Sequence, residues 1–262
     1  MKKSLITSVA ALAVGLFAFA ETGMYVKLKN GETFRHNVDD VEEVVFAEIQ
    51  EQDPIFKFKK LTNNTASVAV APGITLTSQT IPSEAEIDGK IYKVTHIEKW
   101  GFSSCLQVTN IEIPSSVTSI GDSAFFNCQI LTQINIPSNV TSIGNRAFAG
   151  CISLGDITIP SNVTSIGNGV FAGCSGLEDI TIPSSVTNIG DKAFAGCTGL
   201  EDITIPSSVT NIGDNAFEGC WRLEDITIPS SVTNIGDNAF EGCWRLEDIT
   251  IPSSVTNIGD NA

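Results

Sequence analysis

The sequence has little of what enzyme active sites commonly use. It has two histidines, His36 and His96, and it contains no HExxH motif, nucleophile elbow, phosphate-binding loop or dinucleotide fingerprint. Gly-Asp-Ser at 121–123 is reminiscent of a lipase nucleophile block. The same slot later reads Gly-Asn-Arg, Gly-Asn-Gly and Gly-Asp-Lys, so we expect Ser123 to be a variable exposed position and not a nucleophile. The sequence predicts a protein that is not an enzyme and binds no cofactor or metal ion.

Basic residues are also scarce. The chain has 15 Lys and Arg against 30 Asp and Glu, a formal net charge of −15. From residue 106 onward there are 17 acidic and 4 basic residues, so the acidity is concentrated in the second part of the chain. Such a surface repels nucleic acid and anionic membranes. We therefore expect no nucleic-acid partner, whereas cationic partners or divalent ions are compatible with this charge.

The apolar run at the N-terminus is short. Lys2 and Lys3 precede an apolar stretch from Leu5 to Phe17, and Ala18-Phe19-Ala20 offers a small-residue cleavage site. This pattern predicts a secretory signal peptide at 1–20 that is cleaved before Glu21. A membrane anchor is the alternative, but the run is short and lacks a charged stop. We expect a secreted or cell-surface protein with no membrane insertion after cleavage.

The rest of the chain repeats with a fixed period of 23 residues. Cysteines occur at 105, 128, 151, 174, 197, 220 and 243, and prolines and phenylalanines keep the same step. The block at 206–228 recurs letter for letter at 229–251. A fixed period between 20 and 50 residues indicates a solenoid, in which each coil buries its apolar face against the next. Six complete units run from Pro114 to Ile251, and a partial unit follows at 252–262.

One unit reads C-x-x-L-x-x-I-x-I-P-x-x-V-x-x-I-G-x-x-A-F-x-x. Leu223–Ile228 alternates apolar and polar residues and predicts a short strand with one buried face. Pro229 cannot donate to a ladder and ends this strand. After a Gly-Asp bend, Asp237 is expected to cap a short helical turn through Ala239 and Phe240. The predicted fold is therefore an α/β solenoid, with short parallel strands on the concave face.

The pattern LxxIxIPxxVxxIGxxAFxxC resembles the leucine-rich repeats of the BspA-like family, also called the treponemal type, over about residues 80–262. The resemblance implies a secreted or cell-surface protein. Family members are associated with adhesion to host matrix proteins such as fibronectin and fibrinogen, and with contact between bacteria. It thus implies a protein partner and an adhesin-type function. A glycan-binding or cell-envelope scaffold, and a spacer for a further C-terminal domain, are the alternatives.

The segments before the repeats carry β signals. Asn30-Gly31 and Asp88-Gly89 each predict a two-residue hairpin turn, and residues 41–46 could add a third strand to the first hairpin. From these signals we expect the following division: 21–47 a small β-hairpin unit, 48–60 a linker, 61–113 an N-terminal cap with an irregular first repeat, and 114–262 the leucine-rich repeats.

The repeat that begins at Pro252 stops before its expected phenylalanine. A strand at 246–251 would then be an open edge, which favours aggregation. We therefore expect the chain to be a fragment, whose missing part holds a C-terminal cap and a surface anchor.

The seven cysteines lie one coil apart. In an exported protein they could form disulfides between neighbouring coils. Their number is odd, and side chains stacked in register point the same way. Because free cysteine also behaves as a small buried hydrophobe, the sequence favours a ladder of buried free thiols.

Two sets of residues are candidates for partner binding. The first is an acidic and hydroxyl face on the strands, where neighbouring carboxylates would lie about 5 Å apart; this face could bind Ca²⁺, but a solvated acidic surface is the simpler interpretation. Its columns are Asp156, Asp179, Asp202, Asp225 and Asp248, and Thr158, Thr181, Thr204, Thr227 and Thr250.

The second set is Trp221, Arg222, Trp244 and Arg245, which follow the last two cysteines. Exposed Trp and Arg are typical interface anchors. The alternative is that each Trp stacks on a neighbouring Arg as local packing.

Overall fold

The computed structural model describes residues 17–20, 23–27, 33–36 and 55–262. The chain divides into two compact units, Met1–Gln52 and Asp53–Ala262. In the first, β2 (Gly23–Lys27) pairs antiparallel with β1 (Phe17–Ala20) and with β3 (Thr33–His36). The turn expected at Asn30-Gly31 lies outside the described residues. Residues 1–16 of the predicted signal peptide and the third strand expected at 41–46 lie outside the described residues, so both stay predictions.

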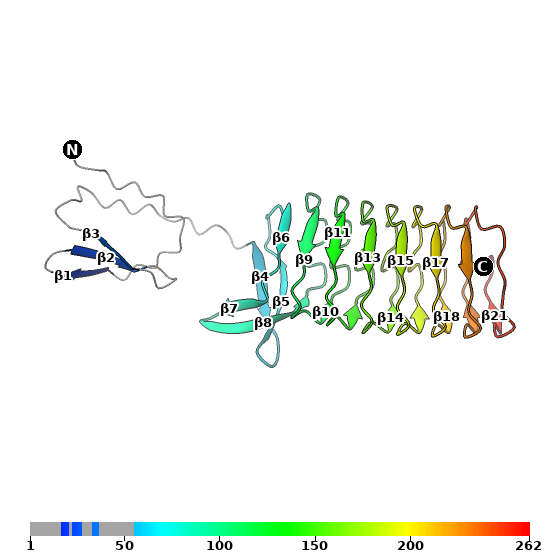
Figure 1. Ribbon diagram of the computed structural model, residues 1–262, viewed down its shortest axis with the longest axis horizontal. Coiled ribbons are helices and arrows are strands. Elements are labelled where there is room, and N and C mark those ends of the chain that lie inside the picture. The colour runs from blue at the N-terminus through cyan, green and yellow to red at the C-terminus, as the bar shows by residue number, and fades with distance from the viewer. Residues whose placement is uncertain (1–16, 21–22, 28–32, 37–54) are drawn as a thin grey trace. The chain divides into compact units, whose positions relative to one another are not determined.

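The second unit is a parallel β-solenoid, shown in Figure 1 as successive coils with their strands side by side. One row of three-residue strands forms one side of the coils. Its members are β6 (Ser78–Thr80), β9 (Asn110–Glu112), β11 (Gln133–Asn135), β13 (Asp156–Thr158), β15 (Asp179–Thr181), β17 (Asp202–Thr204) and β19 (Asp225–Thr227). Register is strict: Ile157 lies opposite Ile180, and Ile203 opposite Ile226.

A second row of two-residue strands forms the next side of each coil. Its members are β10 (Ser119–Ile120), β12 (Ser142–Ile143), β14 (Ser165–Ile166), β16 (Asn188–Ile189), β18 (Asn211–Ile212), β20 (Asn234–Ile235) and β21 (Asn257–Ile258). Asparagine side chains of these strands bond from coil to coil. For example, Asn234 Nδ2 donates to Asn211 Oδ1 at 2.8 Å.

A β-rich segment begins the solenoid unit. β4 (Phe56–Lys60) pairs antiparallel with β5 (Thr65–Val70), which runs parallel to β8 (Lys90–Ile97). β7 (Glu84–Ile87) and β8 form the hairpin expected at Asp88-Gly89, and both turn residues have positive φ, 51° and 71°. β8 then pairs with β10, which joins this segment to the coils.

The linker expected at 48–60 needs correction, because its last residues form β4. The segment FKFKK alternates aromatic and basic side chains. Phe56 and Phe58 pack against the core, and Phe56 contacts the ring of Phe102 at a centroid distance of 6.1 Å. Alternation of apolar and polar side chains with a period of two is typical of a β-strand with one buried face.

The described residues contain no helix, so the α of the predicted α/β label is wrong, and no described segment could cross a membrane as a helix. At 123–128, the segment that includes the expected helical turn, alternate backbone amides donate hydrogen bonds to carbonyls of the next coil. The N–H of Phe125 donates to the carbonyl of Ala147 at 2.8 Å, and that of Asn127 to Ala149 at 2.7 Å. An α-helix needs each N–H for the carbonyl four residues earlier. Ser123 and Asn127 also have positive φ, which interrupts a right-handed helix. Ser123, expected to be exposed, is in fact buried.

The aspartate expected to cap that helix acts on the next coil instead. Asp237 Oδ1 accepts a hydrogen bond from the backbone N–H of Asp260 at 2.8 Å, and Asp214 Oδ1 accepts from Asp237 N–H at 2.9 Å. The same ladder runs back to Asp122 and Asn145. Each side chain thus satisfies a backbone donor 23 residues later, because the coils lie in register.

Seven phenylalanine rings stack along the core at centroid distances of 5.3–5.8 Å, from Phe102 to Phe240. The cysteines are free thiols, six of them buried, and the six from Cys128 to Cys243 each donate to a phenylalanine carbonyl 26 residues earlier. The Cys174 Sγ–Phe148 O distance is 3.2 Å. The thiols therefore belong to the core, as the buried ladder predicts.

The last coil departs from the expected geometry. Residues 246–251, predicted as a strand, form none, although β21 still pairs with β20. Ile249 and Ile251 are 38% and 41% exposed, whereas Ile226 and Ile228 are 7% and 5% exposed. The apolar contacts that fix the earlier strands are therefore incomplete on this coil.

We expect Gly213→Ala to destabilise the protein. A Cβ at Gly213 would lie 2.6 Å from the backbone N of Asp191, so two coils would have to separate. Overpacking of this kind costs about 1–3 kcal/mol of unfolding free energy, measured by urea denaturation. Gly155→Ala is the matched control, because a Cβ there meets nothing within 4 Å. Equal effects of the two substitutions would contradict the close approach of the coils.

We also expect stability to fall above pH 9. Burial raises the pKa of the Cys174 thiol to about 12 from an ordinary value of about 9. Between these values the unfolded chain releases the proton and the folded chain keeps it. The thiol therefore lowers the unfolding free energy by about 1.4 kcal/mol per pH unit in this window. In Cys174→Ala the slope of stability against pH should be flatter by that amount, whereas exposed Thr181→Ala should keep the wild-type slope. An unchanged slope in Cys174→Ala would contradict the burial of a neutral thiol.

Candidate functional site

The first candidate surface, which we call the Asp/Thr face, lies on β13, β15, β17 and β19. In each of these strands the Asp and Thr are exposed and the central Ile is buried. Asp156 lies opposite Asp179, and Asp202 lies opposite Asp225. The structure thus brings four aspartates and four threonines of the prediction into two columns. Asp248 and Thr250 are exposed too, but they lie in the segment that forms no strand.

The carboxylates of this face repel one another. Two charges about 5 Å apart in water cost about 0.8 kcal/mol, so the column tolerates its charge because it is solvated. Among the described residues no three His, Cys, Asp or Glu side chains are grouped closely enough to hold a metal ion. The face therefore offers isolated acceptors and hydroxyls to a partner.

Toward the N-terminal coils the same face changes chemistry. A hollow over β9, β11 and β13 has the following polar lining residues: Asn110, Glu112, Gln133, Asn135, Asp156 and Thr158. Asn110 and Gln133 replace the aspartates of the column there, so this end is less acidic. Any partner that lies along the face would meet a less acidic end and a more acidic end.

The second candidate surface, the Trp–Arg edge, comprises Trp221, Arg222, Trp244 and Arg245. The two indole rings stack on each other with centroids 5.5 Å apart and planes 6° from parallel. Trp221 is 51% and Trp244 78% exposed. The packing of each Trp on an Arg, one of the two readings of the sequence, is therefore wrong, because the 23-residue step places one indole on the other.

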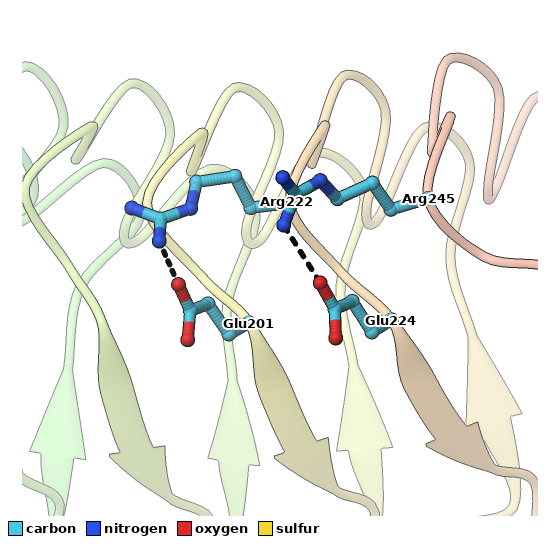
Figure 2. Close-up of polar contacts among 4 residues, drawn as sticks. All are labelled: Glu201, Arg222, Glu224 and Arg245. Atoms are coloured by element: carbon cyan, nitrogen blue, oxygen red, sulfur yellow. Dashed lines mark hydrogen bonds and ion pairs between the residues drawn. The ribbon is translucent and has the colours of Figure 1, made fainter.

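The arginines of this edge bind glutamates of the preceding coil (Figure 2). Arg245 Nη1 donates to Glu224 Oε1 at 2.7 Å, and Arg222 Nη2 donates to Glu201 Oε1. These glutamates were missed as site residues. The signal was in the sequence, because both pairs are 21 residues apart, one coil less two residues. Exposed ion pairs contribute little stability, so their main effect is to fix where the guanidinium groups lie.

The two surfaces meet in one hollow, which has a volume of about 500 Å³. We call it the indole–carboxylate hollow. It is lined by Glu224, Asp225, Trp244, Arg245, Glu247 and Asp248. Residues that the sequence assigned to separate surfaces therefore share one site on the last two coils.

Trp100, by contrast, lies outside these surfaces. Its ring contacts Phe126 edge-on at a centroid distance of 5.6 Å. It lines a hollow in the β-rich segment together with Leu106 and Cys105.

This architecture, a parallel β-solenoid in which each repeat position forms a column of side chains, is that of leucine-rich repeat proteins. The family described as BspA type Leucine rich repeat region matches residues 95–220 and 167–262, with six copies. The chain belongs to this family. No protein of curated function matches it significantly.

Solved structures support the same fold. A leucine-rich repeat protein from Bacteroides ovatus is 36% identical with a TM-score of 0.74, over 79% of this chain and 54% of that one. The Treponema pallidum leucine-rich repeat protein TpLRR is 32% identical with a TM-score of 0.68, over 74% of this chain and 89% of that one. A Eubacterium ventriosum protein is 26% identical with a TM-score of 0.60, over 88% and 52%. The chain thus spans about half the length of the B. ovatus and E. ventriosum proteins.

We expect Trp221→Thr with Trp244→Thr to leave stability nearly unchanged. The preceding coil has Thr198 in this slot and stacks equally well, and the indoles are largely exposed. The unfolding free energy in urea should change by less than about 1 kcal/mol. Phe171→Ala, which removes a fully buried ring from the phenylalanine stack, should lower the unfolding free energy by about 3–5 kcal/mol. A loss of similar size in the Trp variant would mean that the indoles are structural.

Proposed function

We propose that the chain is an exported, cell-surface binding module of the adhesin type, which attaches to host matrix proteins or to other cells. The predicted signal peptide at 1–20 supports export. Its family and its solenoid support a binding scaffold, because stacked coils present long and nearly rigid surfaces. The sequence pattern carries no catalytic motif, and the part of the chain that the structure describes groups no catalytic constellation that would support an enzyme.

The exposed, preorganised Trp221–Trp244 stack is the observation that carries this proposal. Monomeric proteins seldom expose large aromatic side chains together, and Trp and Arg dominate the binding energy of interfaces. Neither indole is needed to close a coil, since other coils have Thr198 or Ser175 in that slot. The stack therefore fits an anchor for a protein partner.

Glycan binding is the second candidate function. The indole–carboxylate hollow combines an exposed ring of Trp244 with carboxylates, and both groups suit sugar recognition. It would make the chain a glycan-binding or cell-envelope scaffold. We rank it second because the net charge of −15 favours partners that carry positive charge.

The test is binding of the purified whole chain to immobilised fibronectin, fibrinogen, laminin and cell-wall glycans at physiological salt. We expect saturable binding to at least one protein and about tenfold weaker binding by Trp221→Thr with Trp244→Thr. A control variant, Trp100→Phe, should bind like the wild type.

Two other results would count against adhesion to proteins. Saturable binding to glycans alone, lost in the double Trp variant, would establish the second function. Binding to nothing in the panel would favour a spacer that holds another domain away from the cell.

A further inference from the structure

The two indoles stack on each other, and no cation of the described residues lies over either ring. The cation–π contacts that the described residues make lie in other coils and in the β-rich segment. Arg222 and Arg245, the nearest cations in sequence, are held by Glu201 and Glu224 (Figure 2). The Trp–Arg edge is thus built so that its own guanidinium groups bind glutamates and leave the indoles exposed.

The charges around Trp244 are unequal. Of the four carboxylates that line the indole–carboxylate hollow, Glu224 is neutralised by Arg245. Asp225, Glu247 and Asp248 form no ion pair among the described residues, which leaves about three negative charges beside an exposed aromatic ring. An anionic group would be repelled by these carboxylates. A cation gains both from the ring quadrupole and from the carboxylates.

We propose that the indole–carboxylate hollow receives an arginine side chain from a basic segment of a protein partner. This inference rests on the proposed function and names the chemistry of the partner. A guanidinium is planar, so it can lie parallel to the ring of Trp244 while its edge donates two hydrogen bonds to one carboxylate. The Asp/Thr face continues from the hollow along the strands and offers further acceptors to basic residues that flank this arginine.

The test uses the whole chain and two peptides of identical length, Gly-Arg-Gly-Arg-Gly and its citrulline twin. Citrulline keeps the shape of arginine and lacks the charge. Isothermal titration at about 50 mM and about 300 mM NaCl measures both, because salt screens exposed charges over about 10 Å. We expect the arginine peptide to bind at least about tenfold more tightly than the citrulline peptide, and to weaken at the higher salt.

A double Trp variant and one matched pair of Asp variants locate the site. Trp221→Thr with Trp244→Thr should weaken arginine-peptide binding about fivefold or more, the size expected from loss of a cation–π contact together with its packing. Asp225→Asn, in the hollow, should weaken it more than Asp156→Asn, three coils earlier in the same column. Thermal melts of each variant verify the fold.

Three results would overturn the inference. The first is equal binding of the arginine and citrulline peptides. The second is an equal loss in Asp225→Asn and Asp156→Asn, which would assign binding to the overall acidity. The third is wild-type arginine-peptide affinity in the double Trp variant.

The inference and the proposed function can fail separately. If the whole chain binds a matrix protein and the arginine peptide does not bind, adhesion stands and the inference is wrong. If the arginine peptide binds in the hollow and no protein of the panel does, the hollow stands and adhesion to those proteins is wrong. An oligosaccharide that displaces the arginine peptide from the wild type, with no preference for arginine over citrulline, would assign the hollow to glycans.

Discussion

The structure depends on hydrogen bonds that run from each coil to the next. Phe125 N–H donates to Ala147 O at 2.8 Å, and Phe194 N–H donates to Ala216 O at 2.8 Å, so the aromatic side of every coil is satisfied by its successor. Buried backbone groups must be paired, and these phenylalanine amides find their partner 22 residues further along the chain. This requirement forces strict register, and strict register stacks every repeat position into a column. Phenylalanine rings, thiols and the aspartates of the turns are therefore columns for the same reason.

The candidate site is a consequence of the same register. A single coil with Trp and Arg would present one indole and one guanidinium. The duplicated block at 206–251 presents each of them twice, one coil apart. The two indoles then stack, and each guanidinium reaches the glutamate of the coil before it. The stack lies beside the acidic column because Cys, Trp, Arg, Leu, Glu and Asp are consecutive in the repeat. Duplication of a unit thus converts a single exposed Trp into a broad aromatic surface with fixed neighbouring charges.

The sequence predicts the repeat, the buried positions and the parallel strands, because a period of 23 with alternating apolar residues requires a coil that hides Ile226, Ile228, Val232 and Ile235. It does not predict the turn at 123–128, because the hydrogen-bond partners of that segment lie in the next coil and leave no local signature. β4 is missed because a strand of five residues next to Asp-Pro resembles a linker until Phe102 provides its packing partner. The columns of the Asp/Thr face follow from the period alone. The period also places one Trp beside the other and each Arg near a glutamate 21 residues earlier, but the contacts themselves depend on how far each side chain extends along the solenoid.

Residue-resolved amide hydrogen exchange on the whole chain tests the coil-to-coil hydrogen bonds most directly. The N–H groups of Phe125, Phe148, Phe171 and Phe194 donate only across coils. We expect them to exchange slowly and to a similar degree, and residues 247–251, which form no strand, to exchange far faster. Phenylalanine amides that exchange as fast as residues 247–251 would show that the coils are not joined in this way, and the columns that form the candidate site would lose their physical basis.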